Sequence, residues 1–248
     1  MKYKFYATLL DAFQGYLSSS EIYQQFWGFS ENPETSEEDF EKQQFQSLID
    51  RINRVPFESE AAEKGTAFNE MIDCIIEGRT SDKYVIMADR EHGIINVKND
   101  RYSFDFPLKL SSEIAKQLDG ALTQQFVEGI MPTKYGDVLL YGYMDQLLPF
   151  KMVDIKTTKK YNAFKYRNNW QYKVYPFCLH QNQVFIEDFE YVITDFKKVY
   201  TELYVYDHVR DFQELQSHCE RFIEFLESHR HLITDTKIFA LDEMDVVL

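Results

Sequence analysis

Two aspartates and a lysine form the part of this 248-residue sequence with the clearest chemistry, namely Asp145, Asp154 and Lys156. We expect the two carboxylates to lie close together, and two like charges so placed are destabilising unless a cation compensates them. Lys156 supplies one positive charge, and Mg²⁺ or Mn²⁺, which prefer oxygen ligands, would supply two. The backbone carbonyl of Ile155 could be a further ligand. Such a group suits phosphodiester hydrolysis, because a metal activates water and a lysine can orient that water or stabilise charge on phosphorus.

Two neighbouring predicted strands must position these groups. Side chains alternate along a strand, so Asp154 and Lys156 share one face while the apolar residues beside them take the other. If Pro149-Phe150 is the middle of the connecting turn, Asp145 and Asp154 become cross-strand neighbours. Their Cβ atoms would then be about 4.5–5.5 Å apart.

The predicted helix after these strands adds polar groups that could meet a substrate. Gln171 and Tyr175 are four residues apart and share a helix face, and Arg167 lies one turn earlier on the same side. We expect this face to touch a nucleic-acid backbone, with Trp170 or Tyr172 available for base stacking.

The charge distribution favours a local nucleic-acid surface over general polyanion binding. The chain has 27 Lys and Arg against 41 Asp and Glu, a formal net charge of −14. Residues 151–173 nevertheless contain seven basic side chains and one acidic side chain, a net +6. We expect Lys159 and Lys160 in this segment to contact phosphates, while the acidic remainder confines DNA to this face.

The order of predicted elements indicates an α/β protein with a mixed sheet. Apolar periodicity and turn residues predict the following elements, with a break at Ser18–Ser20 in the first helix and another near Pro176. They are helices at 5–28, 37–54, 59–77, 111–121, 161–181 and 208–231, and strands at 83–88, 92–98, 101–108, 123–131, 138–147, 151–157, 183–194 and 198–206. We expect a single domain, 1–248, with a helical N-terminal extension (1–58), a core (59–206) and a C-terminal helix and tail (207–248).

Four short motifs in order resemble the PD-(D/E)xK nuclease superfamily, in particular its RecB-like and CRISPR-associated exonuclease branch. That branch has a helix with G-x-x-x-H, strands with G-x-x-D and (D/E)-x-K, and a helix with Q-x-x-x-Y. The corresponding segments are Gly65-Thr66-Ala67-Phe68-Asn69, Gly142-Tyr143-Met144-Asp145, Asp154-Ile155-Lys156 and Gln171-Tyr172-Lys173-Val174-Tyr175. The resemblance covers about residues 64–175. It implies a restriction-endonuclease-like mixed sheet flanked by helices.

The resemblance also implies roles for particular residues. Asp145 and Asp154 would be metal ligands, Lys156 the catalytic lysine, and Gln171 and Tyr175 site-lining residues that contact substrate. Asn69 stands where the branch usually has a metal-binding histidine, and an amide oxygen is a weaker ligand than an imidazole. Glu70 could replace it as a third carboxylate, since other members of the superfamily use a helix glutamate near the metal. The chain has no cysteine quartet, so the iron–sulfur cluster of some members is not expected.

We therefore expect a Mg²⁺- or Mn²⁺-dependent deoxyribonuclease, more plausibly an exonuclease than a sequence-specific cutter, because no DNA-reading module is evident. One alternative is an inactive protein on the same scaffold that binds nucleic acid or a partner. Another is a small-molecule-binding protein in which Asp145, Asp154 and Lys156 form only a salt-bridge cluster. Nucleotide-loop, G-x-S-x-G and H-E-x-x-H motifs are absent.

The remaining expectations concern location and assembly. The three cysteines, Cys74, Cys178 and Cys219, are far apart and odd in number, which favours reduced thiols in the cytoplasm. No apolar stretch is long enough to span a membrane, and no signal peptide is evident. DNA is the expected partner, and the sequence leaves open a homo-oligomer or a partner recombination protein.

Overall fold

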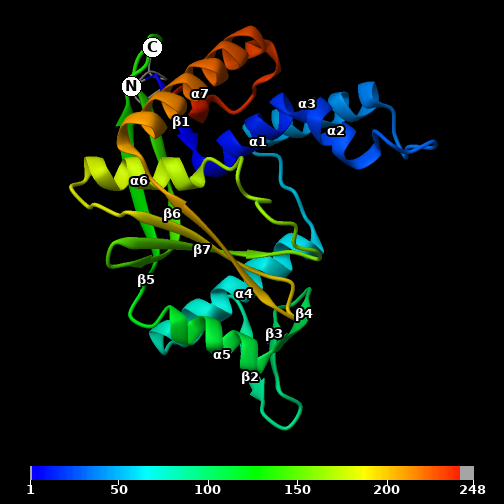
Figure 1. Ribbon diagram of the computed structural model, residues 1–248, viewed down its shortest axis with the longest axis vertical. Helices are drawn as coiled ribbons and strands as arrows, with labels where there is room; N and C mark the ends of the chain where they lie inside the picture. Colours follow the sequence, from blue (N-terminus) through cyan, green and yellow to red (C-terminus); the bar gives the residue numbers. More distant parts are fainter. Residues whose placement is uncertain (1, 241–248) are drawn as a thin grey trace.

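The computed structural model describes residues 2–240, in which seven α-helices surround a mixed six-stranded sheet and a small antiparallel sheet (Figure 1). In chain order the elements are β1 (Tyr3–Tyr6), α1 (Ala7–Leu17), α2 (Ser19–Trp27), α3 (Glu37–Ile52), α4 (Glu60–Glu77), β2 (Val85–Asp89), β3 (Ile94–Lys98), β4 (Ser103–Pro107), α5 (Leu108–Gln117), β5 (Leu122–Met131), β6 (Val138–Leu148), β7 (Lys151–Thr157), α6 (Gln171–Gln181), β8 (Asp188–Thr194), β9 (Val199–Val205) and α7 (His208–Ser228), then short 3₁₀ helices at Arg230–Leu232 and Thr236–Phe239. The expected mixed α/β fold is confirmed.

One edge of β6 pairs first with β1 and then with β7, and we call the gap between these two pairings, at Gly142–Asp145, the fork. The fork sets the geometry of the candidate site. The strands of the large sheet run in the order β1-β6-β7-β8-β9, and β5 pairs with the other edge of β6. Val138–Tyr141 of β6 pairs in parallel with β1, whereas Gln146–Leu148 pairs antiparallel with the start of β7. The four residues between these two stretches, Gly142–Asp145, have no strand partner on that edge within residues 2–240. Their side chains and backbone are therefore available for other contacts.

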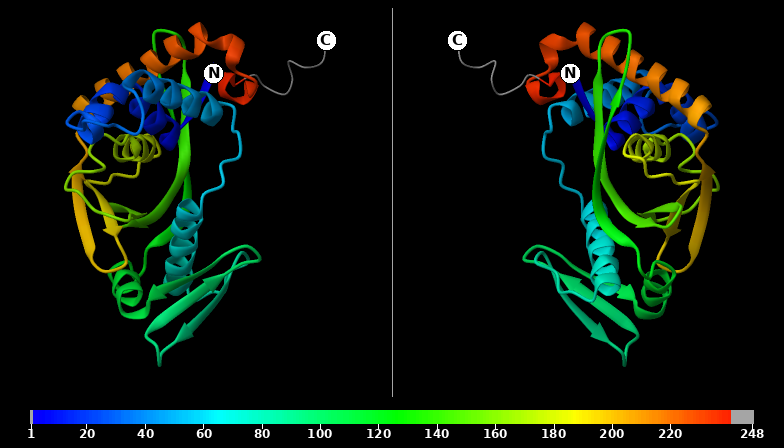
Figure 2. Two further views of the ribbon diagram at one scale, coloured as in Figure 1. Left: turned by 90° about the vertical axis from the view of Figure 1, so that its right-hand side faces the viewer. Right: turned by 90° about the vertical axis from the view of Figure 1, so that its left-hand side faces the viewer.

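Helices cover both faces of the large sheet at its centre, where β7 and β8 are buried on both sides. One core lies between the sheet and helices α1, α3, α6 and α7, and it includes buried Phe5, Phe13, Met152, Phe177 and Phe222. The second core lies between the sheet, α4, α5 and the small sheet β2-β3-β4, as the side views show (Figure 2). Val153 and Ile155 face this second core, so β7 alternates between the two faces as predicted.

The predicted N-terminal extension is largely part of the core. Residues 5 and 6, expected in a helix, belong to β1, and the buried face of α1 packs among α3, α6 and α7. The expected break between the first two helices is confirmed, with Ser18 at the N-cap of α2. Among residues 2–240, none of the helices combines the length and apolar character that a membrane span requires.

The predicted helix at 161–181 was the largest error in the elements, since α6 begins only at Gln171. Residues 161–170 form successive turns, and Phe164 has a positive φ of 60° that a helix cannot accommodate. The Glu202 carboxylate also accepts the backbone N–H groups of Lys165 and Tyr166, which a helix would use internally. Pro176 lies inside α6 without ending it, and burial of the residues around it offsets the lost hydrogen bond.

Candidate active site

The turn between the two central strands has the predicted register. Gln146 lies opposite Val153, and Pro149-Phe150 occupies the turn, where Phe150 has a positive φ of 62°. One step further along the same register sets Asp145 opposite Asp154, at the point where the hydrogen-bond ladder between β6 and β7 opens. The two aspartates are therefore placed together by the hairpin, as the sequence indicated.

Asp145 fills the opening of the fork. Its Oδ2 accepts a hydrogen bond of 3.3 Å from the backbone N–H of Ile155, in place of a strand partner. The side-chain amide of Asn69, from α4, donates to the same Oδ2 at 3.3 Å and lies 3.5 Å from the Ile155 carbonyl oxygen. The structure thus brings together Asn69, Asp145 and the Ile155 carbonyl, three of the five predicted metal-binding groups.

Asp154, Lys156 and Gln171 form a closed triangle on the α6 side of the sheet. Lys156 Nζ lies 2.8 Å from Asp154 Oδ2 and donates to Gln171 Oε1 at 2.8 Å. Gln171 Nε2 in turn donates to Asp154 Oδ1 at 3.0 Å. Asp154 and Gln171 are buried, whereas the Lys156 side chain is 24% exposed. The lysine is therefore the member of the triangle that a substrate can reach.

The charges at this centre are incompletely balanced. Burial raises the pKa of Asp145, and repulsion from Asp154 raises it further. Burial also raises the pKa of Asp154, although Lys156 and Gln171 oppose the rise. Burial lowers the pKa of Lys156, but attraction to both aspartates outweighs it and the net pKa is raised. Two neighbouring carboxylates, one buried and one half-buried, thus share one ammonium group, an arrangement that an additional cation would relieve.

Close packing explains the glycines of two motifs. A Cβ on Gly142 would lie 2.7 Å from the Tyr175 ring, so only glycine lets this ring pack on β6. A Cβ on Gly65 would lie 3.1 Å from Thr157 Oγ1, where α4 approaches the end of β7. Tyr175 is 4% exposed and packs behind the centre, which corrects the expectation that it contacts substrate directly.

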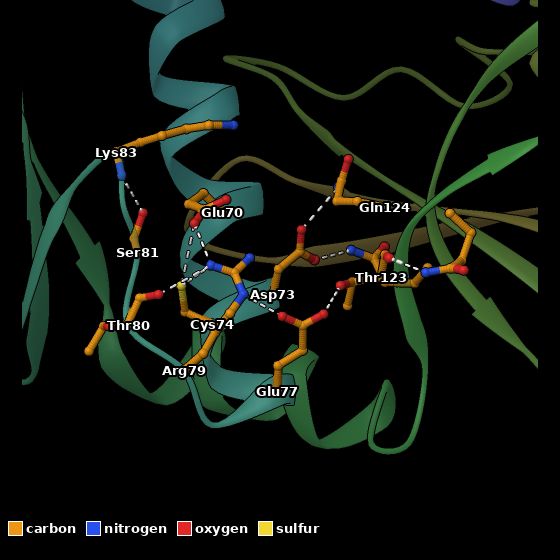
Figure 3. Close-up of polar contacts among 12 residues, drawn as sticks. Glu70, Asp73, Cys74, Glu77, Arg79, Thr80, Ser81, Lys83, Thr123 and Gln124 are labelled. Atoms are coloured by element: carbon orange, nitrogen blue, oxygen red, sulfur yellow. Dashed lines mark hydrogen bonds and ion pairs between the residues drawn. The ribbon is translucent and has the colours of Figure 1, made fainter.

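Glu70 does not join the centre, which corrects its prediction as a ligand. Its carboxylate pairs with Arg79 at 2.7 Å, away from the fork (Figure 3). Burial raises the pKa of Glu70, but bonds from Arg79 and Ser81 outweigh it, so the net pKa is lowered. The acidic α4 residue that lies beside the fork is Asp73, which is buried and accepts from Gln146 Nε2 at 2.8 Å.

Two acidic residues near the site, Asp73 and Asp11, were not predicted from the sequence, although helix spacing could have indicated Asp73. Asp73 is four residues after Asn69 and shares its helix face, whereas Glu70 is rotated away from it. Asp73 also accepts from Gln124 Nε2 at 2.9 Å, and Gln124 has a positive φ of 48° beside the fork. The other missed residue, Asp11, lies in α1, and no local pattern connects that helix with the motifs.

The basic segment 151–173 is partly neutralised by partners. Lys151 pairs with Glu190 at 2.6 Å, and Lys173 is buried between Glu214 and Asp211. Within the described part of the chain, four members of the segment are exposed and have no ion-pair partner. Three are the predicted phosphate contacts Lys159, Lys160 and Arg167, and the fourth is Lys165, which donates to Thr158 Oγ1. Arg167 lies in the turns before α6, so it does not share a helix face with Gln171 and Tyr175.

The two aromatic residues expected to stack on bases are already packed. The Trp170 ring stacks on His218 with centroids 3.9 Å apart and an interplanar angle of 8°. The Tyr172 ring stacks on Tyr204 at 4.5 Å. One face of each ring is thus occupied by a neighbouring aromatic ring, both residues are half-buried, and base stacking stays a prediction.

A groove of about 610 Å³ lies at the end of β7, directly after Lys156. Thr157, Thr158 and Lys159 line it from β7 and the following residues, and Lys64 lines it from α4. Lys64 Nζ is 4.5 Å from the centroid of the Phe196 ring, which holds the ammonium group in this groove. The groove thus combines hydroxyl and ammonium donors with two carboxylates, Glu60 and Asp195.

The oxygen atoms at the fork suit a small divalent cation. Within residues 2–240 no group of three or more His, Cys, Asp and Glu side chains is arranged to hold a metal ion. The fork instead offers two carboxylates, the Ile155 carbonyl and the Asn69 amide. Asn69 Oδ1 is buried and has no hydrogen-bond partner in the described part of the chain. Carboxylate, carbonyl and amide oxygens are ligands for Mg²⁺ and Mn²⁺, so the set fits.

Comparisons with known proteins add little to this picture. No family model matches the chain, and no curated protein matches it. A crystal structure of SSO0001 is similar at a TM-score of 0.44 with 10% sequence identity, covering 89% of this chain and 77% of that one. A likeness of this degree is too low to indicate a shared function.

Proposed function

We propose that this chain is a Mg²⁺- or Mn²⁺-dependent deoxyribonuclease with a restriction-endonuclease-like core, acting as an exonuclease. One observation carries the proposal. The fork between β6 and β7 joins Asn69, Asp145, Asp154 and the Ile155 carbonyl beside Lys156, and burial leaves its two carboxylates short of positive charge. A centre of this kind is unfavourable for the fold alone and useful for cation binding.

The proposed roles follow from the contacts. Asp145, Asp154, the Ile155 carbonyl and Asn69 would hold the cation, which when bound lowers the pKa of water and neutralises charge on the phosphoryl group. Lys156 has three N–H donors, of which one meets Asp154 and one meets Gln171. A remaining donor of this partly exposed side chain can meet a phosphoryl oxygen. Gln171 orients the lysine, because its amide bonds both other members of the triangle.

The remaining substrate contacts are proposed from exposure and charge. Lys159, Lys160 and Arg167 would bind phosphates beyond the reacting bond, and the groove that contains Lys159 and Lys64 would receive the strand. Exonuclease action is proposed because the sequence offers no separate DNA-reading module. We also propose a cytoplasmic location, which agrees with three buried cysteines that are all free.

The test is degradation of linear, circular and single-stranded DNA in Mg²⁺, in Mn²⁺ and in EDTA, with Lys156→Ala beside the parent. We expect metal-dependent loss of linear DNA by the parent, none by the variant, and little loss of circular DNA. Loss of circular DNA at the same rate would overturn exonuclease action. Equal cleavage by Lys156→Ala would overturn the assigned site.

A second candidate function is a protein on this scaffold that binds DNA without cleaving it. Asn69 favours it, because an amide is a weaker ligand than the histidine usual at this position in the branch that the chain resembles. The same experiment separates the two functions. Salt-dependent DNA binding without metal-dependent cleavage would support the second, and Asn69→His would then be the variant expected to restore activity.

A further inference from the structure

The N-terminal helix α1 reaches the candidate active site through one carboxylate, Asp11. Its Oδ1 accepts a hydrogen bond from the backbone N–H of Trp170, a residue 159 positions further along the chain. Trp170 immediately precedes α6, and no side chain caps this end of the helix by the usual N-cap bond. A carboxylate at a helix N-terminus is also favoured by the helix dipole. Asp11 is therefore the side chain that fixes where α6 begins.

Trp170 is held on its other sides as well. Its ring stacks on His218 of α7, and the His218 ring nitrogen Nε2 lies 3.1 Å from the Leu10 carbonyl oxygen of α1. Lys173 Nζ lies 4.7 Å from the centroid of the Trp170 ring. Trp170, the residue before α6, is thus contacted by α1 through its backbone N–H and by α7 through its ring.

The residue after Trp170 is Gln171, the first residue of α6 and the one that bonds both Asp154 and Lys156. A shift of Trp170 therefore moves the Gln171 amide. Burial raises the pKa of Asp11 more than the Trp170 N–H and attraction to Lys156 lower it, so the net pKa is about 7, and the influence of Lys156 agrees with a position near the centre. Asp11 itself makes no hydrogen bond to the triangle in the described structure.

We propose that Asp11 is a positioning residue, which sets Gln171 through the Trp170 backbone and thereby orients Lys156 against Asp154. The kinetic consequence rests on the proposed nuclease function, whereas the positioning of Trp170 and Gln171 does not. A displacement of about 1 Å in a reacting group can lower a rate about 100-fold, so an indirect contact of this kind can control turnover.

The experiment uses a Trp27→Phe background, because Trp27 is the other of the two tryptophans and its removal makes emission report Trp170 alone. Asp11→Ala removes the acceptor, Asp11→Asn keeps an acceptor oxygen, and Asp119→Asn is the control because Asp119 is exposed. Three properties are measured on folded protein: Trp170 emission, amide hydrogen exchange of the segment 166–172, and kcat and KM for linear DNA. Asp11→Leu, of similar volume, replaces Asp11→Ala if the latter does not fold.

We expect Asp11→Ala to shift Trp170 emission, to speed exchange at 166–172, and to lower kcat about 10- to 100-fold with KM within about twofold. Asp11→Asn should restore emission and exchange and recover kcat to within about threefold, and Asp119→Asn should match the background. Unchanged emission and exchange in Asp11→Ala would overturn the proposal, as would a raised KM at constant kcat or an Asp11→Asn as defective as Asp11→Ala. If the parent cleaves no DNA, the proposed function fails while emission and exchange still decide the positioning.

Discussion

Two groups of carboxylates on either side of Asp73 differ in how their charges are balanced. At the fork, Asp145 and Asp154 share one lysine, and burial raises the pKa of each. At the end of α4, Glu70 and Glu77 both pair with Arg79, and their net pKa values are lowered (Figure 3). Carboxylates that are paired stabilise the fold, whereas carboxylates left short of positive charge cost stability and are typical of a functional site.

The direction of each pKa shift determines whether the group's contribution to the free energy of unfolding is lost as pH rises or as pH falls. The pKa of Asp145 is raised in the folded state, so its contribution to the free energy of unfolding is fully present below its ordinary pKa of 3.8. That contribution is lost as pH rises through the raised pKa. A lowered folded pKa means that the contribution of Glu70 is present above its ordinary pKa of 4.5 and is lost as pH falls through the lowered value. The two groups therefore respond to pH in opposite directions.

The largest expected effect is on cleavage in Asp154→Asn. Loss of this charge weakens the hold on the cation and frees Lys156 from its partner, so initial rates on linear DNA should fall about 1000-fold or more. The fold should survive, because the variant removes a buried carboxylate next to another. Glu70→Gln is the matched control and should retain a rate within about threefold of the parent. A similar rate loss in both variants would remove the distinction between the two groups.

The next effect concerns the metal requirement of Asn69→Ala. The Asn69 amide lies beside Asp145 and the Ile155 carbonyl, and its buried Oδ1 has no hydrogen-bond partner among residues 2–240, so the variant should need about 10-fold more Mn²⁺ for half-maximal cleavage. Titration of cleavage with Mn²⁺ measures this, and Glu70→Gln serves again as the control. An unchanged requirement in Asn69→Ala together with a raised one in Glu70→Gln would restore Glu70 as the ligand.

A smaller effect, on stability alone, is expected for Arg79→Met. This change leaves Glu70 and Glu77 without their shared cation and should lower the free energy of unfolding by about 1–2 kcal/mol. Urea denaturation measures the loss, and cleavage by the folded variant should stay near the parent rate. A loss of activity without a loss of stability would mean that the α4 cluster belongs to the active site.

The smallest effect is in the pH dependence of thermal unfolding without metal. The melting temperature of the parent should fall as pH rises above about 4, while Asp145→Asn should show a flatter profile and a melting temperature a few degrees higher at pH 8. Glu70→Gln should instead flatten the profile on the acid side. Identical profiles for the parent and Asp145→Asn would show that Asp145 is not held in an unfavourable charged state.

Local patterns predicted much of the fold and of the fork, because they depend on short-range geometry. Strand alternation and the turn at Pro149-Phe150 were enough to place Asp145 beside Asp154, and the register is confirmed. Helix spacing failed at 161–170, since Glu202, from a distant strand, takes the backbone donors of that segment.

The missed residues show where local reasoning ends. Helix geometry could have indicated Asp73 in place of Glu70, because it shares a face with Asn69. Nothing local to α1 could have indicated Asp11, because only the packing of α1 against α6 brings it to Trp170. The pairing of Glu70 with Arg79 was likewise invisible, although the two residues are only nine apart.

The most direct test of the account is Mn²⁺ binding, measured by isothermal titration calorimetry on the parent, Asp145→Asn and Glu70→Gln at pH 7.5 without DNA. We expect the parent and Glu70→Gln to bind Mn²⁺ with the same stoichiometry and affinity, and Asp145→Asn to bind at least about 10-fold more weakly. Binding that is lost in Glu70→Gln and kept in Asp145→Asn, or no binding by the parent, would contradict a metal centre at the fork.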